Sequence, residues 1–543
     1  MSFFRAINVI FTLNLTKLYF MKYLLLTIGN LFFFIAILFS QTDTVTVNMI
    51  KPADSIDFFM PQFDTYILKA KATKTDTSAV YTESYFMVNA EKVLAYEFGE
   101  YFVGEWTPTT TGNYNVSFTA KTSANGEAST EVNFDLKQNA TDKTFIAFED
   151  ALVKFGGAGR TVYRTANLPN HLGAYDSLHA VLDVVCPTGD CDPWDRKAWI
   201  DAKGPDGNWI ELIRYMTPYG TSCSHTIDLS DYIFMLEGNV DFRIFTDTWA
   251  GSWEYNLTLN YFAGTPEHKY GNAVSVYDGN YALGDYANLQ PFEEMNFEFN
   301  DNIQKAQLNM LLSGHGWGQN NTNNAAEFYN ITNKLYLNGD SIDQNPWNDC
   351  NPNPDACTGQ AGTWQYNRAG WCPGAITLPF KYDLTYYISD AEINIHYKYQ
   401  EDYVDLCHSN HPDVASLAGC DPSAGENPYF VFGTALLTYG NGFPFETISR
   451  PIGLNVKNID QFDFEVFPNP ATEQLIIVFE DVKQPFILIH NIMGQKMKRV
   501  STATILKNNN KVIIDLATFE NGIYFVDLYN GKNISTKKFI VQK

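Results

Sequence analysis

The sequence predicts an all-β protein in which two adjacent antiparallel jelly-roll lobes are flanked by a small β-sandwich at each end. Stretches with alternating apolar and polar residues recur along the chain, and no helical pattern of comparable length interrupts them. Aromatic residues make up 15% of the sequence, which favours strands. A chain of 543 residues is too long for a single core, and we expect roughly three or four domains.

The charge balance narrows the classes of partner. The chain has 37 basic and 61 acidic residues, so its net charge is −24. Nucleic-acid binding needs a basic surface stripe, and this composition predicts no nucleic-acid partner. Self-repulsion keeps such an acidic exported protein soluble, and we expect a monomer.

Residues 1–40 have the pattern of a secretory signal peptide. A basic residue, Lys22, precedes a long apolar stretch that ends at Ser40, and we expect translation to start at Met21. An uncleaved membrane anchor is the alternative, but no basic stop-transfer flank follows. All eight cysteines lie between Cys186 and Cys420, which in an exported chain predicts disulfides.

Residues 42–139 are expected to form the first β-sandwich. A turn at Gly112 precedes a stretch in which Tyr114, Val116, Phe118 and Ala120 alternate with polar residues, as in a half-buried strand. A Trp-Thr-Pro sequence before this Gly-x-Tyr strand resembles bacterial immunoglobulin-like (Ig-like) modules. That resemblance implies a spacer or adaptor.

The central block, residues 141–441, contains the clearest strand patterns. Apolar residues alternate with polar ones over 253–261, 305–312 and 391–399, so that each strand buries one face, as antiparallel sandwiches and jelly rolls require. The sequence Gly264-Thr-Pro266 divides the block into lobes at 141–266 and 267–441.

The densest chemistry follows the predicted strand 179–185. Cys186 and Cys191 can close a small loop, and behind it come Asp192, Trp194 and the pair Asp195-Arg196. Acids beside a bulky apolar wall and a cation are typical of carboxylates tuned for proton transfer. A stapled turn with a surface ion pair is the alternative interpretation.

Three other segments of the central block carry candidate site residues. Asp247 ends an apolar strand, with Trp249 two residues later. A glycine-rich turn at 313–318 precedes Glu327, and Arg368 opens the sequence Arg-Ala-Gly-Trp-Cys-Pro-Gly, which contains Trp371. Each is weak evidence alone, because an aspartate at a strand end usually caps a turn. Together they suggest a site for a sugar and an amide.

After a polar linker at 442–463, residues 464–543 resemble the C-terminal sorting domain of the type IX secretion system. Pro-Asn-Pro, a Met493-Gly-Gln-Lys496 turn and Gly-Ile-Tyr follow one another in the order of that family. The resemblance implies a bacterium of the Bacteroidetes, recognition by the secretion machinery and export across the outer membrane to the medium or the cell surface. A carbohydrate-binding sandwich is the alternative.

Taken in order, the motifs of residues 141–441 resemble the peptide-N-glycosidase F family. Cys-x4-Cys-Asp-x-Trp-Asp-Arg and Arg-Ala-Gly-Trp-Cys-Pro-Gly are the most specific. The resemblance implies two jelly-roll lobes with the active site in the cleft between them. It also implies an amidase that releases N-glycans from asparagine in glycoproteins or glycopeptides. No metal or other cofactor is expected.

The resemblance implies catalytic roles for Asp195, Glu327 and Asp247, with Asp195 as the essential acid. It implies substrate-binding roles for a second set, namely Trp194, Arg196, Trp249, Arg368 and Trp371. Two positions depart from the family. Asp247 is one methylene shorter than the family's glutamate, and the cysteines that bracket the acid at Glu327 are absent.

The family also implies a Cys186–Cys191 disulfide, which proximity supports independently. It implies a second between Cys350 and Cys372, with Cys357 as the alternative partner. Cys407–Cys420 follows by exclusion. Cys223 and Cys357 are then left without an assigned state.

Three other functions compete with this interpretation. A copper-dependent monooxygenase on two jelly rolls would need clustered histidines, and the nine histidines include no His-x-His pair. A glycan-binding protein without catalysis fits the same fold. A glycoside hydrolase also uses paired acids, but it would leave a sugar on the asparagine.

Overall fold

The computed structural model describes residues 43–156, 159–187, 191–316, 325–420, 427–442, 448–451, 464–479, 485–491, 496–500, 511–530 and 533–543. In this part of the chain the prediction of an all-β protein is confirmed. The helical elements there are short 3-10 turns, η1 (Ser230–Met235), η2 (Thr385–Asp390) and η3 (Val414–Ser416). None of the helices in these ranges is long and apolar enough to span a membrane. The predicted signal peptide lies outside the described residues.

The N-terminal unit is a sandwich of two sheets, ordered β1-β3-β7-β6 and β12-β2-β9-β8-β4-β5. Val116, Phe118 and Ala120 on β8 are buried, as their alternation predicts, and pack with Phe58 and Trp106. The Ig-like resemblance stays a prediction. The strands are β1 (Val45–Lys51), β2 (Phe58–Phe59), β3 (Tyr66–Lys74), β4 (Tyr81–Val88), β5 (Glu91–Leu94), β6 (Tyr96–Phe98), β7 (Tyr101–Trp106), β8 (Gly112–Thr122), β9 (Glu127–Lys137) and β12 (Asn170–His171).

The first lobe packs a sheet ordered β10-β18-β13-β16 against one ordered β11-β17-β14-β15-β26, and all its strand pairs are antiparallel. The alternating residues of β18, from Trp253 to Tyr261, are buried in the core between the two sheets. The strands are β10 (Lys143–Lys154), β11 (Thr161–Leu168), β13 (Tyr175–Val185), β14 (Lys197–Lys203), β15 (Trp209–Met216), β16 (Cys223–Asp228), β17 (Gly238–Thr246), β18 (Ser252–Ala263) and β26 (Ile376–Thr377).

The second lobe packs sheets ordered β19-β29-β21-β27 and β23-β22-β28-β20-β30. The predicted strand at 391–399 begins one residue later, because Ala391 closes η2 in the left-handed conformation with φ 60°. The strands are β19 (Tyr270–Ala282), β20 (Met295–Glu298), β21 (Lys305–His315), β22 (Asn333–Leu337), β23 (Asp340–Gln344), β24 (Trp347–Asn348), β25 (Arg368–Ala369), β27 (Phe380–Asp383), β28 (Glu392–Lys398), β29 (Tyr429–Gly440) and β30 (Ile448–Pro451).

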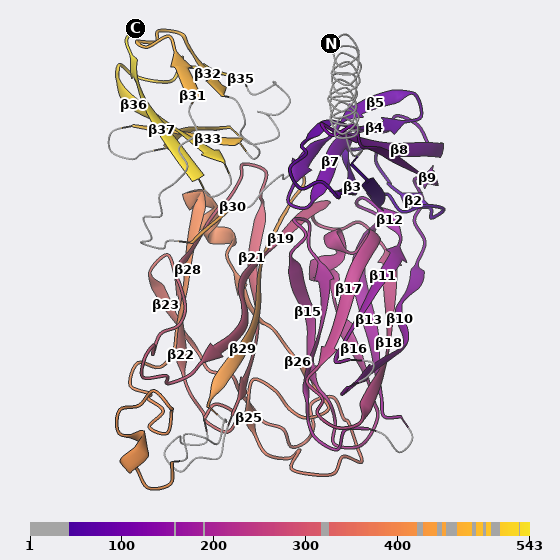
Figure 1. Cartoon of the computed structure of the whole chain (residues 1–543), viewed down its shortest axis with the longest axis vertical. Coiled ribbons are helices and arrows are strands. Elements are labelled where there is room, and N and C mark those ends of the chain that lie inside the picture. The colour runs from indigo at the N-terminus through magenta and orange to yellow at the C-terminus, as the bar shows by residue number, and fades with distance from the viewer. Residues whose placement is uncertain are drawn as a thin grey trace, which may run out of the picture.

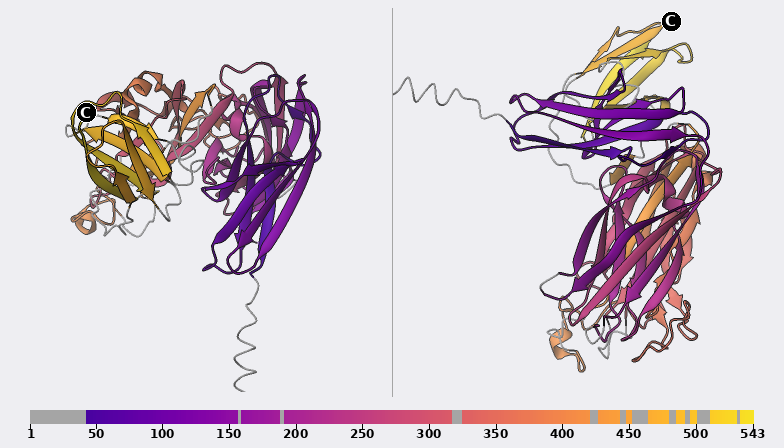
Figure 2. Two further views of the ribbon diagram at one scale, coloured as in Figure 1. Left: turned by 90° about the horizontal axis from the view of Figure 1, so that it is seen from above. Right: turned by 90° about the vertical axis from the view of Figure 1, so that its right-hand side faces the viewer.

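Several strands cross the boundaries expected from the sequence. β12 pairs in parallel with β2 of the N-terminal sandwich, and β26 joins the sheet of the first lobe from the second. β30, in the stretch predicted as a linker, pairs with β20. The lobes stand side by side in Figure 1, with β25 near the end opposite the N-terminal sandwich. In Figure 2 the strands of that sandwich run across the long strands of the lobes.

Buried charges join the two lobes. Arg214 on β15 is 1% exposed and donates to the hydroxyl of Ser313 on β21 at 3.2 Å and to the carbonyl of Val431 on β29. The same guanidinium bonds both carboxylate oxygens of Glu211. Burial raises the pKa of Glu211, because desolvation there exceeds the opposing effect of Arg214.

Asp201, on β14 beside this network, is expected to make the free energy of unfolding depend on pH. Burial, reinforced by the charge of Glu211, raises its pKa from 3.8 to about 7 despite its contact with Arg243. The folded protein therefore holds this proton more tightly than the unfolded chain, and the contribution of Asp201 to stability is lost as pH rises from 3.8 toward 7. We expect Asp201→Asn to gain about 1–3 kcal/mol relative to wild type over that window.

Urea unfolding at a series of pH values measures this difference. Asp241→Asn is the matched control, because its carboxylate lies on the exposed surface of neighbouring β17 and accepts from Thr165 at 2.6 Å. A constant gap between wild type and Asp201→Asn at all pH values would contradict the expectation.

The C-terminal unit has two sheets, ordered β31-β32-β35 and β34-β33-β36-β37. Leu475, Ile477, Val526 and Phe539 pack in its core. Its predicted Met493-Gly-Gln-Lys496 turn lies largely outside the described residues. The strands are β31 (Phe464–Phe467), β32 (Gln474–Phe479), β33 (Pro485–Asn491), β34 (Lys496–Val500), β35 (Lys511–Asp515), β36 (Gly522–Asn530) and β37 (Asn533–Val541).

Candidate active site

Arg368 joins two of the predicted catalytic acids. Its side chain is fully buried, and its Nε lies 3.1 Å from Oε1 of Glu327. Its Nη2 lies 3.3 Å from Oδ2 of Asp195. Asp195 comes from the first lobe, whereas Glu327 and Arg368 come from the second. The structure therefore brings together three residues that are far apart in the sequence, at the junction of the lobes.

Backbone hydrogen bonds fix the segments that carry these side chains. Asp195 lies just before β14, and Glu327 lies in a turn after β21, where its amide donates to the carbonyl of Gly316 at 3.1 Å. The amide of Ala369 donates to the carbonyl of Glu327 at 2.9 Å. The turn with Glu327 is thus attached directly to the strand with Arg368, which supplies positioning that the family's cysteines would otherwise give.

The rest of the guanidinium is also held. Its Nη1 donates to the carbonyls of Thr363 at 3.2 Å and Tyr366 at 2.7 Å. Its Nη2 also lies 3.5 Å from the hydroxyl of Tyr219. The rings of Phe328 and Trp371 lie 5.0 Å and 4.8 Å from its central carbon. These contacts together fix the orientation of the guanidinium. It therefore acts as a rigid donor between two carboxylates.

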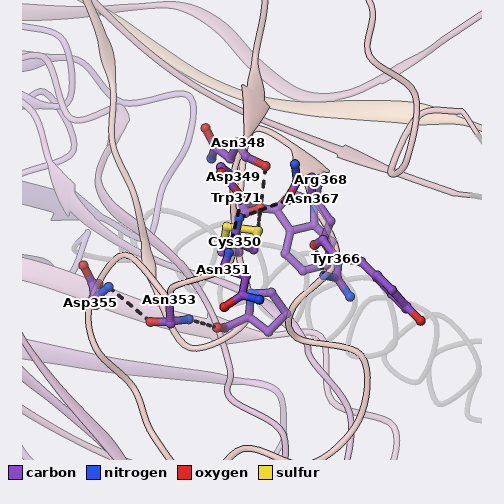
Figure 3. Close-up of a disulfide and its surroundings, with 12 residues drawn as sticks. Asn348, Asp349, Cys350, Asn351, Asn353, Asp355, Tyr366, Asn367, Arg368 and Trp371 are labelled. Atoms are coloured by element: carbon purple, nitrogen blue, oxygen red, sulfur yellow. Dashed lines mark hydrogen bonds between the residues drawn. A yellow bond between two sulfur atoms is a disulfide. The ribbon is translucent and has the colours of Figure 1, made fainter.

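A disulfide and a glycine fix the turn after Arg368. Cys350 bonds Cys372, and the amide of Cys350 donates to the side chain of Asn367 at 3.3 Å (Figure 3). Gly370 has φ +86°, and a Cβ there would lie 2.3 Å from the carbonyl oxygen of Leu312. Only glycine fits so close to β21, which explains the Arg-Ala-Gly-Trp order of the motif.

The environment of Asp195 favours its protonated form more than water does. Burial raises the pKa of the carboxyl, while the charge of Arg368 and a hydrogen bond from Tyr219 oppose the rise. The pKa of Tyr219 is itself raised, by burial first and then by the charge of Asp195, so the phenol remains a donor. A carboxylate in such a setting is more basic than one at the surface.

Asp192 organises the loop around Asp195. It is completely buried, and its oxygens accept from Nε of Arg196 at 2.7 Å, the hydroxyl of Thr248 at 2.7 Å and the amide of Trp194 at 3.0 Å. The amide of Trp249 lies 3.3 Å away. Burial alone would raise its pKa, but these hydrogen bonds hold the pKa below its usual range. One carboxylate thus positions three predicted substrate-binding residues.

Replacing Asp192 with Ala is expected to lower the free energy of unfolding by about 2–4 kcal/mol, because the half-buried guanidinium of Arg196 and the buried hydroxyl of Thr248 lose the acceptor that they share. Asp192→Asn keeps some acceptors and should lose less. Urea unfolding of both variants tests the expectation, with Asp183→Asn on the preceding strand β13 as the control. A loss below about 1 kcal/mol for Asp192→Ala would contradict the role of this carboxylate.

Asp247 forms ion pairs with Arg160 and Lys197. Its oxygens lie 2.7 Å from Nη1 of Arg160 and 3.3 Å from Nζ of Lys197. The guanidinium of Arg160 also lies 3.9 Å from the ring of Trp249. Lys197 donates to the hydroxyl of Tyr429 at 2.6 Å. Asp247 therefore belongs to a second charged group beside the first, and its reach to substrate stays a prediction.

The three predicted tryptophans differ in exposure. Trp194 is 58% exposed and Trp249 is 55% exposed, so both present aromatic surface to solvent. Trp371 is 3% exposed, and its indole donates to the carbonyl of Gly314 at 2.8 Å while stacking on His315. The ring of Trp371 presents little surface to solvent, so the substrate-binding role that the resemblance implies for it stays a prediction. Trp371 packs against Arg368.

The described cysteines form four disulfides. The predicted pairs Cys186–Cys191, Cys350–Cys372 and Cys407–Cys420 are confirmed. Cys223 and Cys357, unassigned from the sequence, bond each other across 134 residues and tie β16 to a loop of the second lobe. No group of three or more potential metal ligands occurs among the described His, Cys, Asp and Glu residues.

Two residues of the site had no signature in the sequence. Tyr219 and Thr363 hydrogen-bond each other at 3.1 Å and both contact Arg368. Neither lies in a motif, and they are 144 residues apart. Only the pairing of the lobes brings them together.

Comparisons with known proteins match several parts of the chain. Residues 284–416 match the family model described as peptide-N-glycosidase F, C terminal. Residues 465–542 match the secretion system C-terminal sorting domain. A relative from Elizabethkingia miricola, named peptide-N(4)-(N-acetyl-beta-D-glucosaminyl)asparagine amidase F, is 29% identical over 289 residues, which span 50% of this chain and 80% of the relative.

Solved structures were also matched. One, described as recombinant peptide:N-glycanase F, is 22% identical, with a TM-score of 0.49 over 58% of this chain and 100% of its own. Another, a glycosylasparaginase from Flavobacterium meningosepticum, is 21% identical, with a TM-score of 0.48 over 57% of this chain and 100% of its own. From the family models, residues 284–416 form a peptide-N-glycosidase F domain and residues 465–542 a secretion system sorting domain.

Proposed function

We propose that the protein is a secreted amidase that hydrolyses the bond between N-acetylglucosamine and asparagine in N-glycoproteins or glycopeptides. The observation that supports this most is that the buried guanidinium of Arg368 forms ion pairs with both Asp195 from one lobe and Glu327 from the other. The relative named as such an amidase supports the same reaction. The sorting domain marks the protein for export to the medium or the cell surface.

Hydrolysis of this amide needs an activated water and a proton for the leaving nitrogen. Asp195 removes a proton from water as the oxygen attacks the amide carbon. The protonated carboxyl then gives that proton to the nitrogen as the carbon–nitrogen bond breaks, which leaves an aspartate on the peptide and an amine on the sugar. The raised pKa of Asp195 suits both steps, because it strengthens the base without making the acid too weak.

Arg368 partly neutralises both carboxylates, and its charge favours the ionised form of Asp195 that a general base needs. Glu327 binds sugar hydroxyls or supports proton transfer. The exposed rings of Trp194 and Trp249 offer platforms on which sugar rings stack. Arg196 is hydrogen-bonded to Asp192, which also accepts from the amide of Trp249. Asp247 reaches the ring of Trp249 through Arg160. Both side chains would contact the glycan or peptide on the side of Trp249.

Mass spectrometry of a defined glycopeptide after incubation with the purified protein tests the proposal. The amidase produces a peptide with Asp in place of Asn and a free intact glycan. A glycoside hydrolase would leave a sugar on the Asn, and a protein that only binds glycans would leave the glycopeptide unchanged. Either of these results would refute the proposed reaction.

A further inference from the structure

A cavity lies where the N-terminal sandwich meets both lobes, near the end of the fold opposite β25 and Arg368 (Figure 1). Its volume is about 110 Å³. Tyr66 and Lys69 of β3 line it from the sandwich, Phe234 and Glu237 from the first lobe, and Tyr270 of β19 from the second. The cavity is therefore built from three units of the chain.

The lining carries more positive than negative charge. Lys51, Lys69 and Lys269 line the cavity together with a single acid, Glu237. Two of these cations have a carboxylate partner. Lys51 lies 2.5 Å from Glu237, and Lys269 lies 2.8 Å from Asp64.

Lys69 differs from the other two lysines. Only 7% of it is exposed, and its Nζ donates to the carbonyl of Pro205 at 3.0 Å and lies 3.6 Å from the centre of the Tyr101 ring. Among the described residues no carboxylate lies within ion-pair distance of it. Burial lowers the pKa of Lys69 well below its usual range, the charge of Lys51 adds to this effect, and the more distant charges of Asp206, Glu100 and Glu237 oppose it only in part. A buried ammonium with no carboxylate in direct contact is costly, and an anion beside it would remove much of that cost.

His171, which also lines the cavity, has a similar deficit. It is 5% exposed, and its buried Nε2 makes no hydrogen bond of standard geometry within the described ranges, although contacts with the backbone of Leu236 and Ile233 partly offset the lowering of its pKa by burial. Its amide already donates to Glu237 at 3.3 Å. Buried polar atoms in folded proteins are nearly always paired, so an unpaired nitrogen in a cavity wall indicates a missing ligand or water.

We propose that this cavity binds a small organic carboxylate with an apolar body, a role separate from the proposed amidase reaction. The carboxylate would pair with Lys69, and the apolar body would lie against the aromatic rings of Tyr66, Phe234 and Tyr270. The volume of about 110 Å³ limits the ligand to a short aliphatic acid, because even a benzene ring needs a cavity of about 150 Å³. A ligand held by all three units would also stabilise their docking.

Three compounds of nearly the same size and shape but different charge test this proposal on the full-length secreted protein: propionate, neutral propionamide and cationic propylamine. We expect isothermal titration calorimetry to detect saturable binding of propionate, with propionamide at least about tenfold weaker and propylamine unbound. Propionate should also raise the unfolding temperature. No binding of propionate, or equal binding of the three compounds, would overturn the proposal.

Lys69→Met keeps most of the side-chain volume and removes the charge. It should weaken propionate binding by about tenfold or more. Lys71→Met is the matched control, because Lys71 lies on the same strand, pairs with Glu100 at 2.6 Å and does not line the cavity. Hydrogen exchange of the wild type locates the site even if Lys69→Met does not fold. We expect protection by propionate around 66–70, 234–237 and 269–272, whereas protection around Arg368 alone would contradict the assignment.

Discussion

Replacing Asp195 with Asn is expected to lower the rate of glycan release by about two to four orders of magnitude, the usual cost of losing a general base. Asn has nearly the same shape and still accepts a hydrogen bond from Arg368, which lies 3.3 Å away in the wild type. It cannot take a proton from water. The turnover number should therefore fall while the Michaelis constant for the glycopeptide changes little.

Stability measurements separate this effect from misfolding. Burial raises the pKa of Asp195, so ionising it in the folded protein is unfavourable, and a neutral Asn should keep or slightly increase stability near neutral pH. Asp183→Asn, on the strand that leads into the same loop, is the matched control and should retain full activity. Substantial residual activity in a folded Asp195→Asn protein would remove Asp195 from the role of base.

Replacing Arg368 with Met should lower both activity and stability. The guanidinium is fully buried between two carboxylates, and removing one member of a buried ion pair typically costs about 3–5 kcal/mol. Loss of a fixed charged donor next to the reacting group lowers the turnover number by about two to three orders of magnitude. Activity and urea unfolding of the same variant measure the two losses.

The pH profile gives Arg368 a more specific test. Its charge lowers the pKa of Asp195, so in Arg368→Met that pKa should rise and the acidic limb of kcat/KM should move to higher pH. Arg368→Lys keeps the charge but not the planar fork, and should shift the limb less. Arg164→Gln, at an exposed position on β11, is the control. An unchanged acidic limb in Arg368→Met would contradict the electrostatic role.

Much of this site could be predicted from the sequence because its residues lie in compact motifs. Asp195 and Arg368 stand beside cysteines and glycines whose spacing is distinctive, and the structure brings the two side chains within 3.3 Å of each other, while their catalytic and binding roles stay predictions. The strands could also be predicted, because a strand that buries one face alternates apolar and polar residues. The buried Trp253 and Tyr261 of β18 are examples.

The remainder depends on packing between distant segments. Tyr219 and Thr363 contact Arg368 only because the lobes meet there. Trp371 and Trp249 are both tryptophans, and the sequence alone does not show that Trp371 is buried whereas Trp249 is exposed. The Cys223–Cys357 bond joins different lobes, so spacing along the chain gives no indication of it.

Hydrolysis of the glycopeptide in water enriched in oxygen-18 tests the central claim most directly. If Asp195 drives water onto the amide carbon, mass spectrometry will find the heavy oxygen in the new aspartate of the peptide, and Asp195→Asn will form this product far more slowly. Heavy oxygen on the released sugar, with an unlabelled asparagine left in the peptide, would show attack at the sugar carbon and contradict the account.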